Sequence, residues 1–123
     1  MRPAAIHHVS VNVTDLDVAL AFYTELLGMT VRADRPADLG GGAWLDAGDQ
    51  QLHLIVGAVP SAHGQHFALS VDDLDAAVAE LRGAGAAVAT PVPIGTARQA
   101  FLADPDGNAI ELHEPSMSVA QPS

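Results

Sequence analysis

The chain has 123 residues, of which 49% are hydrophobic and 16% are charged, a composition typical of one soluble globular domain. The net charge of −10 argues against nucleic acid and anionic membranes as partners, because such surfaces repel an acidic protein. The chain has no cysteine, so disulfides are excluded and any metal must be bound by nitrogen and oxygen atoms. The N-terminus has no apolar signal segment, and a cytoplasmic location is expected.

The first half of the chain predicts a strand, a helix and three more strands. Residues 5–13 alternate between apolar and polar side chains, as in a strand with one apolar face. Thr14, with an acid three residues later, is a helix start signal, and leucines at helical spacing continue to Gly28, which ends the helix. Short strands are predicted at about 29–34, 43–46 and 51–56.

The second half repeats this order. Residues 66–71 alternate like 5–13, Asp72 is the predicted N-cap of a helix, and Gly83 or Gly85 ends that helix. Strands are predicted at about 86–90, 97–103 and 109–113.

The segment Asp104-Pro-Asp-Gly-Asn predicts a tight turn between the last two strands. If Ala103 faces Ala109 across that turn, Phe101 faces Glu111 and Gln99 faces His113. By the repeat, Trp44 is expected near His53.

Two pairs of residues have the same separation. His8 and His66 are 58 residues apart, and so are His53 and Glu111. The flanking sequences also match without gaps, so the chain is interpreted as a duplicated unit. The predicted parts are a first unit at 1–57, a linker at 58–65, a second unit at 66–114 and a flexible tail at 115–123.

Three imidazoles and one carboxylate form a ligand set for a divalent transition metal. A single histidine on a strand is more often a satisfied polar group, but these four occupy equivalent repeat positions on the face opposite the core. The sequence therefore predicts a metal site at His8, His53, His66 and Glu111. If His53 is not a ligand, the other three form a two-histidine, one-carboxylate set suited to Fe(II) and dioxygen.

Other residues have weaker assignments. His113 shares the face of Glu111 and either orients that ligand or lies at the surface. Trp44, Gln99 and Phe101 are candidates for lining a substrate pocket, although aromatic residues at strand ends also serve as core. His7 is assigned to the opposite face, where it is either structural or simply exposed.

The residue patterns resemble the vicinal oxygen chelate superfamily over about residues 5–114. This family includes glyoxalase I, methylmalonyl-CoA epimerase, extradiol dioxygenases and bleomycin-binding proteins. The segments that carry the resemblance are Ile6-His-His-Val-Ser-Val-Asn-Val-Thr-Asp-Leu-Asp, Phe22-Tyr-Thr-Glu-Leu-Leu-Gly-Met, Gln65-His-Phe-Ala-Leu-Ser-Val-Asp-Asp-Leu-Asp and Asp104-Pro-Asp-Gly-Asn-Ala-Ile-Glu-Leu.

The resemblance implies an α+β fold in which two tandem βαβββ units form a curled mixed sheet around a metal-containing cleft, with the helices on the outer face. His8, His66 and Glu111 match the family's ligand positions, whereas His53 stands where glyoxalase I has a glutamate and the epimerase a glutamine. One divalent transition metal (Fe, Mn, Co, Ni or Zn) and a homodimer are implied, with each site formed by one chain or by two.

The expected function is that of a metal-dependent enzyme of the glyoxalase/dioxygenase superfamily. Its small-molecule substrate would chelate the metal through vicinal oxygens, and isomerase-, lyase- or epimerase-type proton transfer would follow through a metal-stabilised enolate, with Glu111 as the catalytic residue. One alternative is a bleomycin-resistance-type binding protein without catalysis, and a second is an Fe(II) dioxygenase. A third is a structural member that binds no metal.

Overall fold

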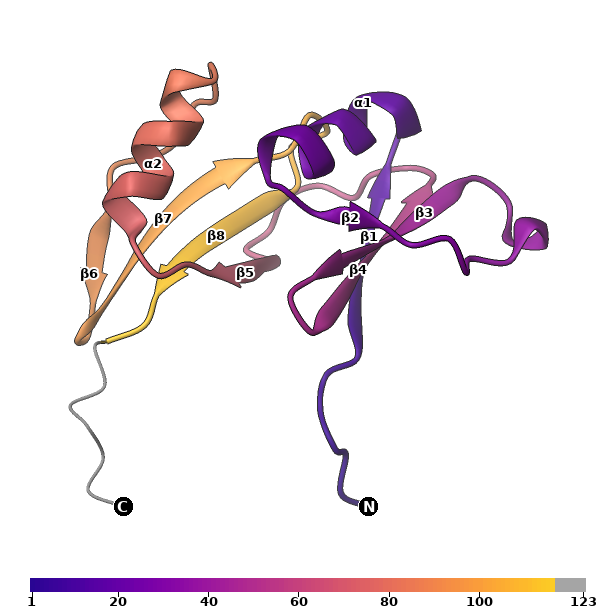
Figure 1. Ribbon diagram of the computed structural model, residues 1–123, viewed down its shortest axis with the longest axis horizontal. Coiled ribbons are helices and arrows are strands. Elements are labelled where there is room, and N and C mark those ends of the chain that lie inside the picture. The colour runs from indigo at the N-terminus through magenta and orange to yellow at the C-terminus, as the bar shows by residue number, and fades with distance from the viewer. Residues whose placement is uncertain (117–123) are drawn as a thin grey trace. The chain divides into compact units, whose positions relative to one another are not determined.

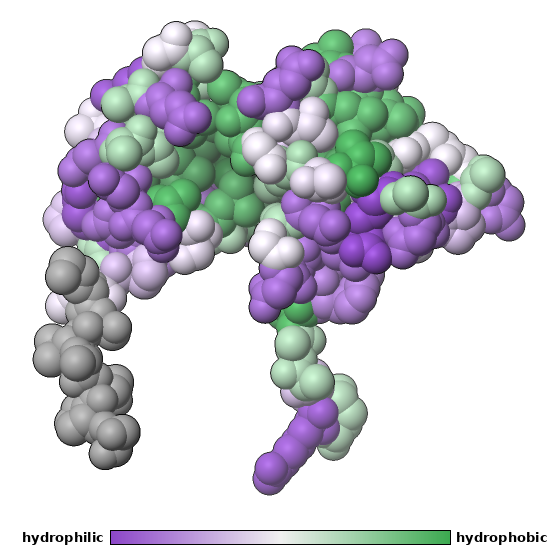
Figure 2. Space-filling model, in the orientation of Figure 1, coloured by the Kyte–Doolittle hydropathy of each residue, from purple (hydrophilic) through white to green (hydrophobic). Residues whose placement is uncertain are grey.

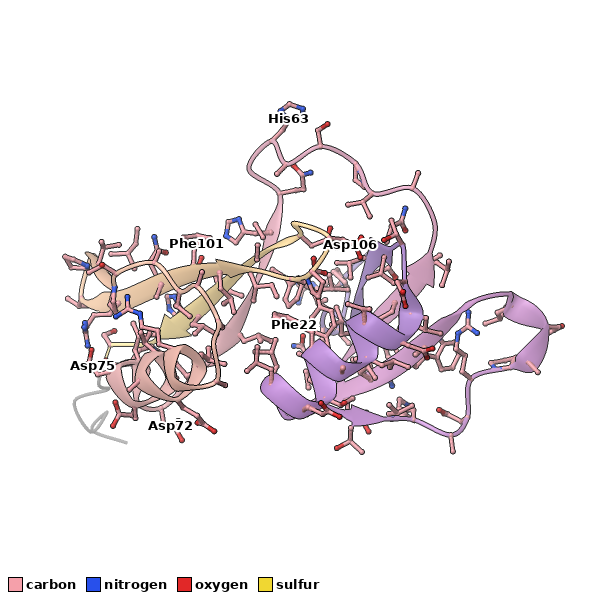
Figure 3. All side chains as sticks on the ribbon, turned by 90° about the horizontal axis from the view of Figure 1, so that it is seen from above. Phe22, His63, Asp72, Asp75, Phe101 and Asp106 are labelled. Carbon is pink, nitrogen blue, oxygen red and sulfur yellow. The ribbon has the colours of Figure 1, made fainter. Side chains whose placement is uncertain are left out.

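The computed structural model describes residues 1–116 and divides the chain into two units, Met1–Ser61 and Ala62–Ser123. The division falls inside segment 58–65. Figure 3 shows His63 on the loop that leads from one unit to the other. From residue 117 onward, the predicted tail lies outside the described residues.

The first unit contains two helical segments, one made of an α-helix continued by a π-helix and one a short 3-10 helix, and four strands (Figure 1). Its sheet has the order β1-β4-β3-β2, with β1 parallel to β4 and the remaining pairs antiparallel. The elements are β1 (His8–Val13), α1 (Leu16–Leu20), the π-helix η1 (Ala21–Leu26), β2 (Thr30–Val31), the 3-10 helix η2 (Ala37–Leu39), β3 (Gly42–Ala47) and β4 (Gln50–Val56).

The second unit repeats this topology, with the sheet order β5-β8-β7-β6 and β5 parallel to β8. Its elements are β5 (His66–Ser70), α2 (Leu74–Gly83), β6 (Val92–Ile94), β7 (Ala97–Ala103) and β8 (Ala109–Glu114). The two parallel strand pairs also share a register. His8 lies opposite Gln51 in the first unit, and the residues 58 positions later, His66 and Ala109, lie opposite each other in the second. The predicted α+β fold of two βαβββ units is confirmed, as two four-stranded mixed sheets.

Each unit has its own apolar core. In the first unit Val13, Tyr23 and Leu54 are fully buried, and in the second Leu74 and Ile110 are. Helix α2 packs on β7 and β8. Figure 2 shows hydrophilic residues over the outer side of this helix and hydrophobic residues beside it, toward its sheet. Because successive side chains along a strand point to opposite faces, the apolar core lies on one face of each sheet and the polar side chains of the strands lie on the other face.

The helix caps lie one residue later than predicted. Asp15, not Thr14, caps α1 and accepts a hydrogen bond from the Val18 amide. Asp73, not Asp72, caps α2, where it accepts from the Ala76 amide. Aspartate caps a helix at least as well as threonine, and an extended residue directly before the first turn reaches the amide three positions on.

Two predicted strands also differ from the structure. The strand predicted at 86–90 does not form, and β6 instead lies at 92–94. Gly95, with φ +60°, makes a two-residue turn that pairs Ile94 with Ala97, so pairing starts directly before this turn. The strand predicted at 29–34 is reduced to Thr30–Val31, after which Arg32 forms ion pairs with Asp34 and Asp46.

Candidate functional site

Two of the predicted ligands meet on one face of the first sheet. His8 lies at the start of β1, and His53 lies in β4 opposite Ser10, two residues further along β1. Their imidazole rings stack with centroids 3.9 Å apart and planes only 12° from parallel. The parallel pairing of β1 and β4 therefore brings the two rings side by side.

Trp44 covers the other side of His53. It lies opposite His53 in the β3–β4 register, and the two rings stack with centroids 4.7 Å apart. The expected placement of Trp44 near His53 is thus confirmed. His53 is only 8% exposed, and this burial, followed by nearby positive charge at His8, lowers its pKa. A neutral imidazole is the form of histidine that binds metal.

Both candidate ligands in this unit are also held by a neighbouring side chain. The Nε2 atom of His53 lies 2.9 Å from Oε1 of Gln51. The Nδ1 atom of His8 lies 2.9 Å from Nδ1 of His7, which is therefore in contact with the candidate ligand. In each ring, one nitrogen is bonded to a neighbour and the other remains for a ligand.

The other two predicted ligands meet in the second unit. His66 at the start of β5 and Glu111 in β8 bring Nε2 and Oε1 to 3.1 Å. The Nδ1 atom of His66 bonds the Gly64 carbonyl at 2.9 Å. The hydrogen bond to Gly64 and then that to Glu111 raise the pKa of His66, against the opposing effect of burial. The Glu111 side chain is 11% exposed, so this carboxylate is largely shielded from water.

The second oxygen of Glu111 is also in contact with a histidine. Its Oε2 atom lies 2.9 Å from Nδ1 of His113, two residues further along β8. The predicted cross-strand pairs of the last hairpin are confirmed, with Phe101 opposite Glu111 and Gln99 opposite His113. The Phe101 ring, labelled on β7 in Figure 3, meets the His66 ring edge-on at 5.1 Å.

The two units thus present matching pairs of donor atoms. Each pair combines the first residue of a first strand with a residue of a last strand, and an aromatic residue lies opposite the latter. No group of three or more histidine and acidic side chains within residues 1–116 is arranged to hold a metal ion. Each unit supplies two of the four predicted ligands.

The donor set fits a divalent transition metal. Imidazole nitrogen and carboxylate oxygen are typical ligands of such ions. Each of the four candidates has one polar atom bonded to a group outside the predicted ligand set, and such bonds orient metal ligands in proteins.

Sequence reasoning missed the contacts of Gln51 and His7. Alternation along β4 places Gln51 on the face of His53, but the contact itself depends on side-chain rotamers that alternation does not give. His7 is adjacent to His8 at the start of β1, where regular alternation does not yet hold.

No helix among the described residues is long and apolar enough to cross a membrane.

Comparison with known proteins agrees with this architecture. The family model of the Glyoxalase/Bleomycin resistance protein/Dioxygenase superfamily matches residues 5–112. The lactoylglutathione lyase of Haemophilus influenzae is 34% identical over 123 aligned residues, covering 89% of this chain and 91% of that protein. The uncharacterized protein YaeR of Escherichia coli is 34% identical over 122 residues, covering 89% of this chain and 95% of that protein.

A solved structure with the same fold is that of TnmS3, an antibiotic binding protein from Streptomyces sp. CB03234. It has a TM-score of 0.82 and 34% identity, and the match covers 94% of this chain and 99% of that chain. The chain belongs to the Glyoxalase/Bleomycin resistance protein/Dioxygenase superfamily. Members of this family typically bind a divalent metal and small-molecule ligands.

Proposed function

We propose that this protein is a metal-dependent enzyme that catalyses proton transfer on a small molecule with two adjacent oxygen atoms. The observation that carries the proposal is the matched pair of donor sets, His8 with His53 and His66 with Glu111. In each set, every candidate ligand has one nitrogen or oxygen atom bonded to a neighbouring group outside the set. A sheet face that only needed satisfied polar groups would not require the same arrangement in both copies.

In this proposal the ligands of a divalent ion (Fe, Mn, Co, Ni or Zn) are His8, His53, His66 and Glu111, supplied by one chain or by two. Three neutral imidazoles and one carboxylate leave a divalent ion with a net charge of about +1. An ion of that charge supplies a Lewis acid for the carbonyl oxygen of a substrate.

The proton is moved by Glu111. It is the only carboxylate among the proposed ligands, and it is the base available for a carbon next to a carbonyl group. Its Oε2 atom lies 2.9 Å from Nδ1 of His113 and its Oε1 atom 3.1 Å from Nε2 of His66, so the two histidines together orient the carboxylate. Trp44 and Phe101 lie opposite His53 and Glu111, where their rings exclude water from the reacting groups.

The Haemophilus influenzae relative supports a lyase or isomerase reaction of the lactoylglutathione lyase type. Candidate substrates are therefore hemithioacetals formed from a thiol and a 2-oxoaldehyde, together with 2-oxo and 2-hydroxy thioesters.

A second candidate function is binding without catalysis. The specific support is the similarity to the antibiotic binding protein TnmS3, which is as close in identity as the lyase. In this case the aromatic residues Trp44 and Phe101 would contact a bound drug, and the donor pairs would be unnecessary for binding.

Solvent deuterium exchange tests the enzyme proposal. The protein is loaded with each metal in turn and incubated in D₂O with the candidate substrates, and NMR follows the proton next to the carbonyl group. We expect exchange in the wild-type protein and its loss in Glu111→Gln, with ligand still bound. No exchange with any metal, together with ligand binding that needs neither metal nor Glu111, would favour sequestration.

We also propose that the protein forms a homodimer with C₂ symmetry, as its relationship to this family suggests. Light scattering is expected to give twice the mass of one chain, and a monomeric mass would overturn this part of the proposal.

A further inference from the structure

One residue of the first unit has a contact that its repeat partner cannot make. Gln51 lies two residues before His53 on β4, and its Oε1 atom is 2.9 Å from His53 Nε2. The position 58 residues later is Ala109, which has no polar side chain. The unit that has an imidazole on its last strand thus has a glutamine beside it, and the unit that has a carboxylate there has alanine.

We infer that Gln51 is a positioning residue that keeps the proton of His53 on Nε2 and so makes Nδ1 the metal-binding atom of that ring. This inference rests on the proposed function, because it assigns the ligating atom of the same site. His53 can then serve as a ligand through Nδ1 while its Nε2 atom is bonded to Gln51.

The chemistry of the contact determines where the proton is. An amide oxygen accepts hydrogen bonds and cannot donate one, so the ring nitrogen that faces Gln51 must carry the hydrogen. A neutral imidazole carries one hydrogen, so its other nitrogen holds the electron pair that a metal needs. For His53 that other nitrogen is Nδ1.

The packing of the ring makes this bond decisive. His53 is sandwiched between the nearly parallel rings of Trp44 and His8, at 4.7 and 3.9 Å, and the residue is only 8% exposed. The sandwich fixes the plane of the ring but still permits a half-turn within that plane. That half-turn exchanges the positions of the ring nitrogens with those of ring carbons, and the hydrogen bond to Gln51 selects one of the two orientations.

The second unit differs from the first in the way that this inference requires. A carboxylate has no tautomer to select, so Glu111 needs no such neighbour at position 109. The imidazole of that unit, His66, has its Nδ1 atom on the Gly64 carbonyl, again an oxygen that only accepts, and its Nε2 atom faces the other proposed ligand of the unit, Glu111. Each of these two rings is therefore held through a hydrogen bond to an oxygen that only accepts.

The test uses the whole chain in its metal-free form and then with zinc. Three variants are compared with wild type: Gln51→Leu removes the acceptor, Gln51→Glu keeps one, and Gln50→Leu is the matched control. Gln50 is exposed and is the first residue of the same strand, so its side chain points to the other face.

Long-range proton–nitrogen NMR of the metal-free protein reads the proton position directly. We expect the His53 signals of a protonated Nε2 and an unprotonated Nδ1 in wild type, Gln51→Glu and Gln50→Leu. In Gln51→Leu the two tautomers are expected to mix. Protonated Nδ1 in wild type, or unchanged signals in Gln51→Leu, would overturn the inference even if no metal ever bound.

Zinc affinity, measured by competition with a chelator, tests the second half of the inference. Loss of an outer hydrogen bond is expected to weaken binding by about 10- to 100-fold in Gln51→Leu, with little change in the other two variants. Equal affinity in Gln51→Leu and wild type would show that His53 Nδ1 does not bind the metal. No zinc binding in wild type would instead refute the proposed function, while the NMR result still decides the proton position.

Discussion

Replacing Glu111 by glutamine tests the hydrogen-bond network of the second unit without any metal. The carboxylate contacts two histidines, at 3.1 Å for His66 Nε2 and 2.9 Å for His113 Nδ1. Glutamine has nearly the same size and shape but only one acceptor oxygen, so one of the two contacts loses its acceptor. The volume of the buried side chain hardly changes, and the loss of the contact dominates.

The cost follows from the environment of the two contacts. A hydrogen bond to a charged group stabilises a protein by about 1.5–3 kcal/mol when it is shielded from water. The Glu111 side chain is 11% exposed, but His66 and His113 are 35% and 36% exposed, so solvent screens part of this energy. We therefore expect Glu111→Gln to lower the free energy of unfolding of the metal-free protein by about 1–2 kcal/mol.

The effect should depend on pH. The folded-state pKa of His66 is raised, by the Gly64 carbonyl first and by Glu111 second. The associated stability is therefore fully present below the ordinary pKa of histidine and is lost as pH rises through the raised value. The deficit of Glu111→Gln should be larger at about pH 6 than at about pH 9.

Urea unfolding of metal-free protein at both pH values measures this, with Glu80→Gln as the control. Glu80 is an exposed glutamate on α2, so its replacement removes the same charge from the same unit. A deficit no larger than that of Glu80→Gln, or one that grows with pH, would refute the reasoning.

Three further predictions concern stability and are checked by urea or thermal unfolding of metal-free protein. Gly42→Ala should lower the free energy of unfolding by about 1–3 kcal/mol, because the added Cβ would lie 2.3 Å from the Leu54 carbonyl oxygen. At Gly83 on α2 an added Cβ meets nothing within 4 Å, so Gly83→Ala should raise the free energy of unfolding by about 0.5–1 kcal/mol. Equal effects would contradict this account. Asp73→Ala should cost about 1 kcal/mol through loss of its cap bond to Ala76, and an unchanged midpoint would argue against the cap. Burial lowers the pKa of His53 in the folded state. The free energy of unfolding should therefore fall as the pH drops from the ordinary pKa of histidine through this lowered pKa, and His53→Gln should lose less stability in acid than wild type. Equal acid sensitivity of the two proteins would contradict this.

The features that the sequence predicted depend on strand alternation and on the repeat. Strand alternation predicted that His8 and His66 lie on the sheet face opposite the apolar side chains of their strands. The assumption that Ala103 faces Ala109 across the last turn then predicted that Phe101 faces Glu111. The repeat then placed Trp44 opposite His53. These relations are geometric consequences of pairing and need no knowledge of side-chain conformation.

The features that the sequence did not predict depend on local energies that differ little between neighbours. Whether Thr14 or Asp15 caps the first helix depends on one hydrogen bond, and so does the choice between Asp72 and Asp73. The position of β6 was set by a two-residue turn and not by its apolar residues. The contact between Gln51 and His53 depends on side-chain rotamers, which alternation alone cannot specify.

Metal content per chain is the most direct test of the central claim. Untagged protein is reconstituted with Fe(II), Mn, Co, Ni and Zn in turn, and mass spectrometry counts the bound metal. The proposal predicts about one ion per chain, lost in both His8→Ala and Glu111→Ala, which remove one ligand from each unit. No bound metal under any condition, or full retention in both variants, would contradict it.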